Sequence, residues 1–540
     1  MYTDASRRRC RRWWFGPVYL SGCHYLAALP NRRKNYYGMF SHASMADIER
    51  YQQFIDGEFV SSESDDRAEV TFPYNGETWA TVPLGTEKDV DRAVTAARDA
   101  FERDDWAGLQ PSDRAGVIRE VAAVIDEHAD ELAELETRQN GKLIREMSGQ
   151  MNSLGDWFRY YASQCETREG DTIPVESKDG EMFNYVVREP YGVVGAVTPW
   201  NSPLLLTTFK LAPALAAGCT FVHKPSTQTP VSALRLAELL HEEAGLPAGV
   251  YNVITGSGST VGDALVDHDD VDKASFTGST GVGRQIGKTA GENLIPASLE
   301  LGGKSPNIVF NDANLDNAIN GVIKGIFAAT GQTCLAGSRV FLHEDIADEF
   351  VGRLSERAGD IELGDPRDPE TQMGPVAFRG QWETNREYIQ TALDEGATLR
   401  FGGDQPDNLP GECFLEPTIL TDVENDMTVA QEEIFGPVVS ILTFNDEEDL
   451  INRANDTDFG LAAGIWTENF RKAKRVADGL EAGTIWINEY RTLTYNSPFG
   501  GYKDSGLGRE NGHEGLEEYT QTKSVWVDLA GEVEDPFTLG

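Results

Sequence analysis

The feature that most constrains the fold is a regular alternation of short apolar runs and longer amphipathic stretches from about residue 184. The runs "VVGAVT", "TFVHK", "YNVIT" and "KASFTG" have the length of buried strands, and "LLLTTFKLAPALAAG", "VSALRLAELLHEEAG" and "TVGDALVDH" between them have helical character. This rhythm predicts a parallel sheet with helices on both faces, and such sheets bind ligands at the carboxyl ends of their strands.

A second alternating series begins after about residue 302, with "NIVF", "LDNAINGVIKGIFAAT", "RVFL" and "IADEFVGRLSERAG". It predicts a second α/β domain. Before the first series, "QFIDGEFV" and "ATVPLGT" predict short strands. The stretches "EKDVDRAVTAARDAF" and "SDRAGVIREVAAVIDEHADELAELETRQNGK" predict two helices, the second capped by Gly141.

The charge balance limits the partners of the chain. It has 88 acidic and 47 basic residues, a net charge of -41, and 14 of the basic residues are Lys. Such a surface repels a phosphate backbone, so we expect no nucleic-acid partner. An acidic, Lys-poor surface around an ordinary share of apolar residues predicts adaptation to high salt, where charge repulsion is screened. Apolar periodicity along nearly the whole chain excludes an acidic disordered protein.

The first 44 residues differ from the rest, with eight Lys or Arg against the single acid Asp4. They are a basic extension with three interpretations. One is a twin-arginine signal whose apolar region is interrupted by Gly16, Gly22 and His24, and which is too short to span a membrane. Another is a start codon assigned too far upstream, with Met45 as the true beginning, and we prefer it. The third is a basic arm for a membrane surface or nucleic acid.

The cysteines and histidines predict neither a disulfide framework nor a protein-bound metal. The six cysteines lie far apart without a CxxC pair, and the eight histidines form no HxH or HExxH arrangement. We therefore expect no chemical role for Cys10, Cys23, Cys165, Cys219 and Cys413. In isolation Cys334 is best explained as a buried packing residue, the usual environment of a lone cysteine.

Several motifs follow predicted strands in a fixed order: "TPWNSP", "HKPSTQTP", "FTGSTGVG", "LELGGKSP", "TGQTCLAGSR", "EEIFGPV" and "PFGGYKDSGLGRENG". Together they resemble the NAD(P)-dependent aldehyde dehydrogenase superfamily, from about Gln53 to about Val527. The resemblance implies an α/β fold with a parallel-sheet cofactor domain (45–167 and 191–301) and an α/β catalytic domain (302–518). It also implies a small β oligomerisation element (168–190 and 519–529) and hence a homodimer or homotetramer.

The resemblance assigns catalytic roles to Cys334, Glu300 and Asn201. A thiolate is a strong nucleophile toward an aldehyde carbon, and the resulting oxyanion needs fixed donors such as the Asn201 amide and the Cys334 N–H. Glu300, 34 positions before Cys334, is the base expected to activate water against the thioester.

The family also assigns a cofactor site. The glycine-rich turn can present N–H groups and the Ser279 hydroxyl to a pyrophosphate. The expected cofactor residues are Thr198, Pro199, Trp200, Lys224, Ser226, Thr227, Gly256, Gly258, Gly278, Ser279, Gly283, Leu301, Glu433 and Phe435. Many NAD-preferring members carry Glu where this chain has Thr227, and the missing carboxylate removes an obstacle to NADP. The cofactor is NAD or NADP, with a mild preference for NAD.

The substrate pocket is the least constrained part. The expected lining residues are Trp157, Tyr161, Tyr490, Arg491 and Tyr495. Arg491 has two interpretations: a ligand for a carboxylated or hydroxylated aldehyde, or an Arg satisfied at the surface of an acidic protein.

These observations predict an enzyme that oxidises a small-molecule aldehyde to its acid, with no membrane partner. Reduced nicotinamide cofactor is used in the cytoplasm, so we expect a cytoplasmic protein. Two alternatives remain: a CoA-acylating relative, against which Glu300 argues, and a non-catalytic binding or structural member of the fold.

Overall fold

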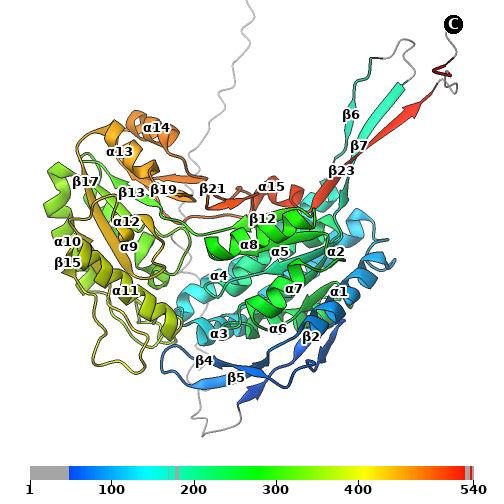
Figure 1. Ribbon diagram of the computed structural model, residues 1–540, viewed down its shortest axis with the longest axis horizontal. Coiled ribbons are helices and arrows are strands. Elements are labelled where there is room, and N and C mark those ends of the chain that lie inside the picture. Colours follow the sequence, from blue (N-terminus) through cyan, green and yellow to red (C-terminus); the bar gives the residue numbers. More distant parts are fainter. Residues whose placement is uncertain (1–47, 168, 177–181, 530–534, 538–540) are drawn as a thin grey trace, which may run out of the picture. The chain divides into compact units, whose positions relative to one another are not determined.

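The alternating runs after residue 184 form the centre of an eight-stranded sheet in a computed structural model that describes residues 48–167, 169–176, 182–529 and 535–537. Its strands are β2 (Gln53–Ile55), β3 (Glu58–Val60), β8 (Val193–Val197), β9 (Thr220–Lys224), β10 (Tyr251–Val253), β11 (Lys273–Thr277), β12 (Ala297–Glu300) and β22 (Gly506–Leu507). Their order is β22-β12-β11-β8-β9-β10-β2-β3, and the five strands from β12 to β10 are parallel (Figure 1). The expectations about residues 1–44 and Met45 lie outside the described residues.

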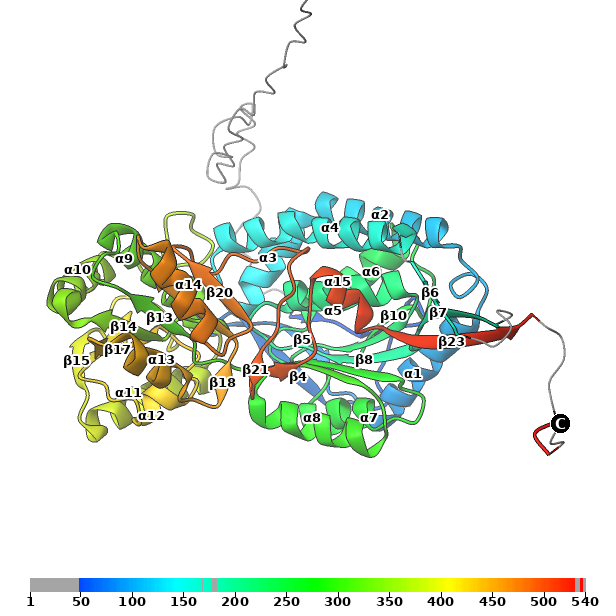
Figure 2. The same cartoon turned by 90° about the horizontal axis from the view of Figure 1, so that it is seen from above.

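Helices cover both faces of this sheet, as predicted. They are α1 (Glu87–Glu102), α2 (Pro111–Glu127), α3 (Ala129–Asn140), α4 (Ile144–Thr167), α5 (Pro203–Ala217), α6 (Val231–Glu242), α7 (Asp263–Val266) and α8 (Thr280–Glu292). Figure 2 shows α2 and α4 on one side of the sheet and α7 and α8 on the other. Each face has its own apolar core, which explains why the central strands are apolar without alternation.

The second series forms a seven-stranded sheet. Its strands are β13 (Pro306–Val309), β14 (Arg339–His343), β15 (Thr398–Phe401), β16 (Thr418–Thr421), β17 (Val438–Phe444), β19 (Ala462–Trp466) and β20 (Thr484–Ile487). Its helices are α9 (Leu315–Ile326), α10 (Ala347–Gly359), α11 (Arg379–Glu395), α12 (Thr428–Gln431), α13 (Glu447–Asn455) and α14 (Phe470–Gly479). The order is β15-β16-β17-β14-β13-β19-β20, parallel except for the β15–β16 pair. Separate apolar clusters pack on its two faces.

Three small sheets complete the structure. The strands are β1 (Glu49–Arg50), β4 (Arg67–Thr71), β5 (Thr78–Pro83), β6 (Asp171–Ile173), β7 (Met182–Pro190), β18 (Phe459–Gly460), β21 (Tyr502–Lys503) and β23 (Thr520–Asp528). The antiparallel sheet β23-β7-β6 forms an arm (Figure 1), while β1-β5-β4 and β18-β21 are separate.

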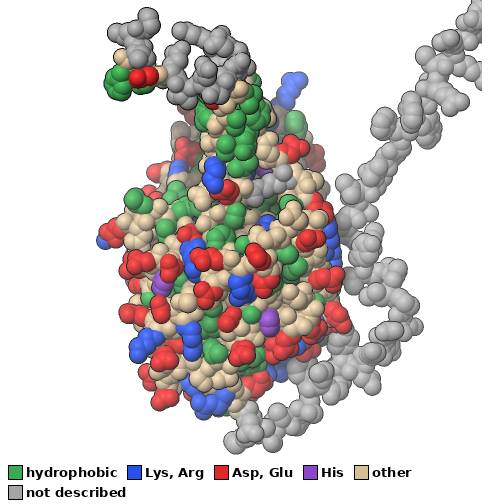
Figure 3. Space-filling model, turned by 90° about the vertical axis from the view of Figure 1, so that its right-hand side faces the viewer, with side chains coloured by type: hydrophobic (Ala, Val, Ile, Leu, Met, Phe, Trp, Pro, Cys, Tyr) green, Lys and Arg blue, Asp and Glu red, His purple; other side chains and the backbone are tan. Residues whose placement is uncertain are grey.

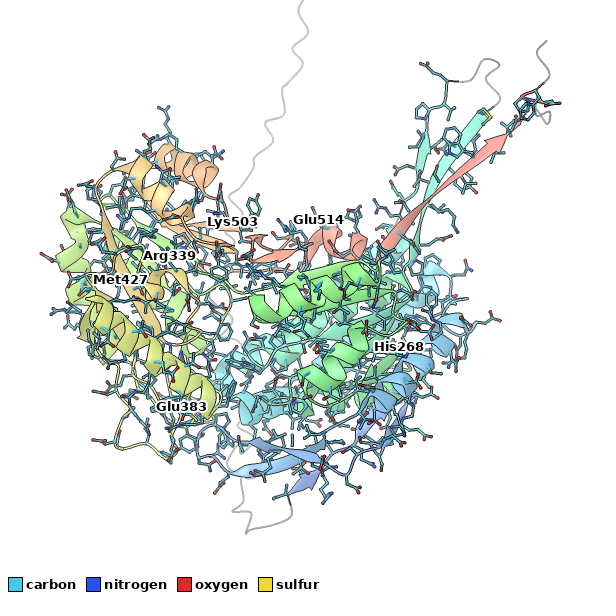
Figure 4. The ribbon with its side chains drawn as sticks, in the orientation of Figure 1. His268, Arg339, Glu383, Met427, Lys503 and Glu514 are labelled. Carbon is cyan, nitrogen blue, oxygen red and sulfur yellow. The ribbon has the colours of Figure 1, made fainter. Side chains whose placement is uncertain are left out.

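The C-terminal segment runs from the second sheet back to the first. β21, β22 and α15 (Gly512–Glu517) lie along this path, on which Figure 4 labels Lys503 and Glu514. β22 belongs to the range expected for the catalytic domain, yet it pairs antiparallel with β12, with Gly506 opposite Glu300. The sheet that carries Glu300 is therefore completed by a segment about 200 residues later in the chain.

Three predicted helices differ from the structure. The expected single helix before Gly141 is broken at His128 into α2 and α3, although Gly141 caps α3 in the left-handed region as predicted. The stretch "TVGDALVDH" starts as a π-helical turn, Gly258–Gly262, and continues as the short α7. The stretch "LDNAINGVIKGIFAAT" leaves the α-helix after Ile326, because the backbone at Ala329 and Thr330 turns left-handed.

Two kinds of feature are absent from the described residues. No helix there is long and apolar enough to cross a bilayer, and no group of three or more His, Cys, Asp or Glu is arranged to hold a metal ion.

Candidate active site

A strained turn precedes Cys334. Ala329, Thr330 and Gly331 have successive positive φ values of 54°, 56° and 70°. An added Cβ at Gly331 would meet the Gly436 carbonyl oxygen at 2.0 Å, so a side chain does not fit there. The carboxylate of Glu146 accepts a hydrogen bond from the Ala329 N–H at 3.2 Å. Left-handed backbone at non-glycine residues is costly and gathers at functional sites, so this turn marks the loop from Ala328 to Leu335.

Cys334 itself is half-buried beside carboxylates. Burial, with the charges of Glu433 and Glu300, raises the pKa of its thiol to about 12. The thiol is therefore protonated in the ligand-free protein, and it needs a base or a compensating positive charge to react. The next residue, Leu335, is fixed by a hydrogen bond that the Tyr490 hydroxyl donates to its carbonyl at 3.0 Å.

Asn201 reaches the same loop from the first sheet. It lies just beyond β8 and is buried, and its side-chain amide donates to the Gln332 carbonyl at 3.0 Å. Gln332 is held in turn by the Ala377 N–H, which donates to its side-chain carbonyl at 2.9 Å. The structure thus brings Asn201 to the loop of Cys334, although 133 positions separate the two residues.

Glu300 ends β12 and is buried, and neither carboxyl oxygen has a hydrogen-bond partner among the described residues. Burial, together with the nearby Glu510 carboxylate, raises its pKa well above the usual range. A buried carboxyl group with free oxygens and a raised pKa has the properties of a general base.

Next to Glu300 is a buried ion pair that sequence reasoning missed. Lys210 Nζ lies 2.5 Å from Glu510 Oε1, and both side chains are almost fully buried. Lys210 is on α5, whereas Glu510 precedes α15, 300 residues later. No local motif signals such a pair, and only the fold brings these charges together.

One group of predicted cofactor residues lies near Cys334 as a wall of two rings and a carboxylate. The rings of Trp200 and Phe435 meet edge to face at 5.2 Å between centroids. Glu433 accepts a hydrogen bond from the Gly303 N–H at 3.1 Å, and burial raises its pKa to about 7. At Gly302, an added Cβ would meet Glu433 Oε2 at 2.3 Å.

A second group lies at the carboxyl ends of β9 and β10. The Thr227 hydroxyl donates to the Gly256 carbonyl at 2.7 Å, and Ser226 precedes it in the same turn. Lys224 is buried, and burial lowers the pKa of its amine to about 8. Gly258 starts the adjoining π-helical turn.

A third group surrounds the start of α8. Ser279 is the N-cap residue, yet its side chain makes no capping hydrogen bond, so it leaves the first-turn N–H groups without a partner from this residue. Close packing requires glycine nearby: a Cβ at Gly278 would meet the Phe276 ring at 2.4 Å, and one at Gly283 would meet Leu301 at 2.3 Å.

These three groups fit a dinucleotide. Free helix N-terminal N–H groups suit a pyrophosphate, the Lys224 amine and the Thr227 hydroxyl are polar groups that suit ribose hydroxyls, and Glu433 with the Trp200 and Phe435 rings suits the nicotinamide end. Thr198 and Pro199 connect β8 to this wall, and Thr198 Oγ1 lies 2.8 Å from His223 Nε2.

The predicted substrate residues are divided by the structure. Trp157 packs on Phe209 and Tyr495, while the buried Tyr161 donates to the Gly512 carbonyl at 3.2 Å. Tyr490 is fully buried in the core of the second sheet, so its side chain supports the loop of Cys334 from behind. Arg491 is half-buried and donates to the Lys324 carbonyl at 3.1 Å.

Comparisons with known proteins agree with this geometry. The model of the "Aldehyde dehydrogenase family" matches residues 59–525. An aldehyde dehydrogenase of Enchytraeus buchholzi is 47% identical, over 89% of this chain and 96% of that protein. The NAD+ complex of a Bacillus cereus aldehyde dehydrogenase is 45% identical with a TM-score of 0.86, over 89% of this chain and 97% of that one. Betaine aldehyde dehydrogenase of Staphylococcus aureus in complex with NAD+ is 40% identical with a TM-score of 0.88, over 91% and 97% of the two chains. The expected α/β fold is confirmed, and the chain belongs to the aldehyde dehydrogenase family, as an enzyme that oxidises aldehydes with NAD(P)+.

Proposed function

We propose that this enzyme oxidises its aldehyde through a covalent thioester on Cys334, with Glu300 as general base and Asn201 as oxyanion donor. The observation that carries the proposal is the convergence of these three residues: the Asn201 amide contacts the Cys334 loop, and the charge of Glu300 raises the pKa of the thiol.

In the first step the Cys334 thiol transfers its proton to Glu300, and the sulfur attacks the aldehyde carbon. The Asn201 amide and the Cys334 N–H donate to the oxygen that becomes negative. A bound NAD(P)+, with its nicotinamide end held by Glu433 and the rings of Trp200 and Phe435, would supply the hydride acceptor for this carbon. Loss of the hydride leaves an acyl group on sulfur. Glu300, after losing its proton to solvent, takes a proton from water. The resulting hydroxide displaces Cys334 from the acyl group, releasing the acid and regenerating the sulfur nucleophile.

For the cofactor we propose NAD or NADP, with a mild preference for NAD. The Lys224 amine and the absence of a carboxylate at Thr227, which would repel a 2′-phosphate, support the admission of NADP. The NAD+ complexes of two relatives support the preference for NAD. The remaining members of the proposed site are Pro199, Ser226, Gly256, Gly258, Gly278, Ser279, Gly283 and Leu301.

We also propose a homodimer or homotetramer that assembles through the arm. Three apolar side chains of the arm are largely exposed, at 43% for Ile173, 41% for Phe183 and 59% for Trp526. A second subunit that covers this surface removes it from water and pairs an open sheet edge.

The working environment that we propose is a salt-rich cytoplasm. Figure 3 shows acidic side chains spread over the face on the arm side, and the whole chain has a net charge of -41. Screening by molar salt reduces the repulsion among these carboxylates.

The experiment that tests the proposal follows reduced cofactor in molar KCl. An aldehyde panel is crossed with NAD and NADP, without CoA, for the wild type and Cys334→Ala. We expect turnover by the wild type and none by the variant. Turnover that depends on added CoA favours the acylating alternative, and a folded wild type inactive on every aldehyde favours a binding role.

A further inference from the structure

Three ionisable side chains at the Cys334 loop have no part in the reaction as proposed. They are Lys142, which is buried between α3 and α4, Glu146 near the start of α4, and Arg491 after β20. Sequence reasoning singled out Arg491 alone.

Hydrogen bonds made by these residues or by their neighbours surround the loop from Ala328 to Leu335. The Lys142 amine donates to the Ser202 hydroxyl at 2.8 Å, and the neighbouring Asn201 contacts Gln332. Glu146 accepts from the Ala329 N–H. Arg491 directly follows Tyr490, whose hydroxyl contacts Leu335. Cys334 therefore lies between loop positions contacted by Glu146, by Asn201 and by Tyr490. Asn201 is the neighbour of Ser202, to which Lys142 donates, and Tyr490 is the neighbour of Arg491.

The positive charges are incompletely neutralised. Among the described residues, neither the Lys142 amine nor the Arg491 guanidinium has a carboxylate oxygen within 4.0 Å, although acids outnumber bases in the chain by 88 to 47. Glu146 faces both cations, but one of its oxygens is engaged with the Ala329 N–H and the other, buried, has no partner. The buried Glu136 also faces Lys142, so two acids face the two cations, but among the described residues neither acid is within ion-pair distance of them.

The amine and the guanidinium also retain free donors. An ammonium has three N–H donors and a guanidinium five, whereas the structure uses one of each, toward Ser202 and the Lys324 carbonyl. Burial lowers the pKa of Lys142 to about 8, and repulsion by Arg491 acts in the same direction. An anion at this place relieves that repulsion and accepts the free N–H groups.

We propose that Lys142 and Arg491 bind the anionic end of the substrate, which makes the substrate class an aldehyde that carries a carboxylate. The inference rests on the proposed role of Cys334, because the anionic group is bound beside the sulfur that attacks the aldehyde. The free N–H donors of both side chains suit an anion, and the planar fork of Arg matches a carboxylate. In so acidic a protein, these two cations also reduce the repulsion of an anionic substrate.

The test compares ω-oxo acids of two to five carbons with uncharged aldehydes of equal length, and includes glyceraldehyde 3-phosphate. The assay uses the wild type, Arg491→Leu, Arg491→Lys and Lys142→Met. All are measured at the same salt concentration, which is the lowest at which circular dichroism shows that every one of them is folded. Arg400→Leu, at an exposed position on β15, is the matched control.

We expect the wild type to prefer one oxo acid over its uncharged counterpart at least tenfold in kcat/KM. Arg491→Leu and Lys142→Met should each reduce this ratio at least fivefold, mainly through KM. Arg491→Lys should retain part of the preference, and Arg400→Leu should keep the wild-type ratio. As a second readout, butanoate should slow alkylation of Cys334 by iodoacetamide in the wild type more than in Arg491→Leu, whereas butanamide should not.

Cys334-dependent oxidation of uncharged aldehydes, without preference for any oxo acid, overturns this inference and leaves the proposed function intact. A preference for the phosphorylated aldehyde overturns the carboxylate assignment. Oxidation that persists in Cys334→Ala, or its absence for every aldehyde, overturns both.

Discussion

The side-chain amide of Asn201 donates a hydrogen bond to the main-chain carbonyl of Gln332, with 3.0 Å between nitrogen and oxygen. An amide nitrogen carries two hydrogens, so the contact uses one and leaves the other. Gln332 lies two residues before Cys334. This contact therefore orients the Asn201 amide near Cys334, and the second N–H of the amide stays available as a donor.

Replacing Asn201 by Ala is therefore expected to lower kcat by about 100- to 1000-fold, since one oxyanion donor of this kind has an effect of that size. Steady-state kinetics of purified Asn201→Ala measure the loss, with Asn201→Asp as the comparison that keeps the size but removes the donor. A decrease below about threefold is incompatible with a donor role.

In Glu300→Gln, the thioester should still form, whereas its hydrolysis should become slow. The amide cannot take a proton from water, so we expect steady-state turnover to fall by about 100-fold or more. A single burst of reduced cofactor, close to one per active site, is expected to remain in stopped-flow absorbance at alkaline pH, where the thiol ionises without Glu300. Equal loss of burst and turnover contradicts a role for Glu300 in hydrolysis.

The reactivity of Cys334 should depend steeply on pH. Burial and three carboxylates raise the pKa of the thiol to about 12, so in the cofactor-free enzyme the thiolate fraction rises about tenfold per pH unit below that value. Alkylation by iodoacetamide, followed by mass spectrometry of the Cys334 peptide between pH 7 and pH 10, measures this slope. A rate that is already maximal at pH 7 shows that the thiolate is stabilised at rest.

The Lys210–Glu510 pair predicts a large effect on stability. Glu510→Gln leaves the buried Lys210 amine without its carboxylate, and removing one partner of a buried pair costs about 3–5 kcal/mol. Reversible chemical denaturation of Glu510→Gln at neutral pH should show this loss. The double variant Lys210→Met with Glu510→Gln should recover part of it, because no unpaired charge stays buried.

Cofactor preference should respond to residue 227. In Thr227→Glu a carboxylate replaces the hydroxyl that contacts the Gly256 carbonyl, and we expect the ratio of kcat/KM for NADP to that for NAD to fall at least tenfold. Thr227→Ser, which keeps the hydroxyl, serves as control. An unchanged ratio places the 2′-hydroxyl away from this residue.

Sequence reasoning predicted the fold where the signals are local, because buried runs ended by polar turns mark the parallel strands. Motifs after β8, at the end of β12 and after the second domain's first helix made Asn201, Glu300 and Cys334 candidates, and their catalytic roles stay predictions. The left-handed turn before Cys334 was expected to be helical, because alanine and threonine give no local sign of positive φ and the turn is held by Glu146 from another helix.

The ion pair between Lys210 and Glu510 also had no signal in the sequence. Lys210 and Glu510 are each unremarkable in their own segments, and their pairing depends on the C-terminal segment returning to the first sheet. Tyr490 was expected at the substrate, whereas its burial places it in the core. A pattern in one segment carries no information about which distant segment it meets.

The pairing of Gly506 with Glu300 also fixes the order in which the enzyme becomes competent during synthesis. Earlier strands can fold as they leave the ribosome, since translation releases about 5–20 residues each second. The edge that supports Glu300 is incomplete until residue 507 of 540 has emerged. During synthesis, Cys334 therefore leaves the ribosome long before the chain can oxidise aldehyde. Truncated products of translation should have no activity.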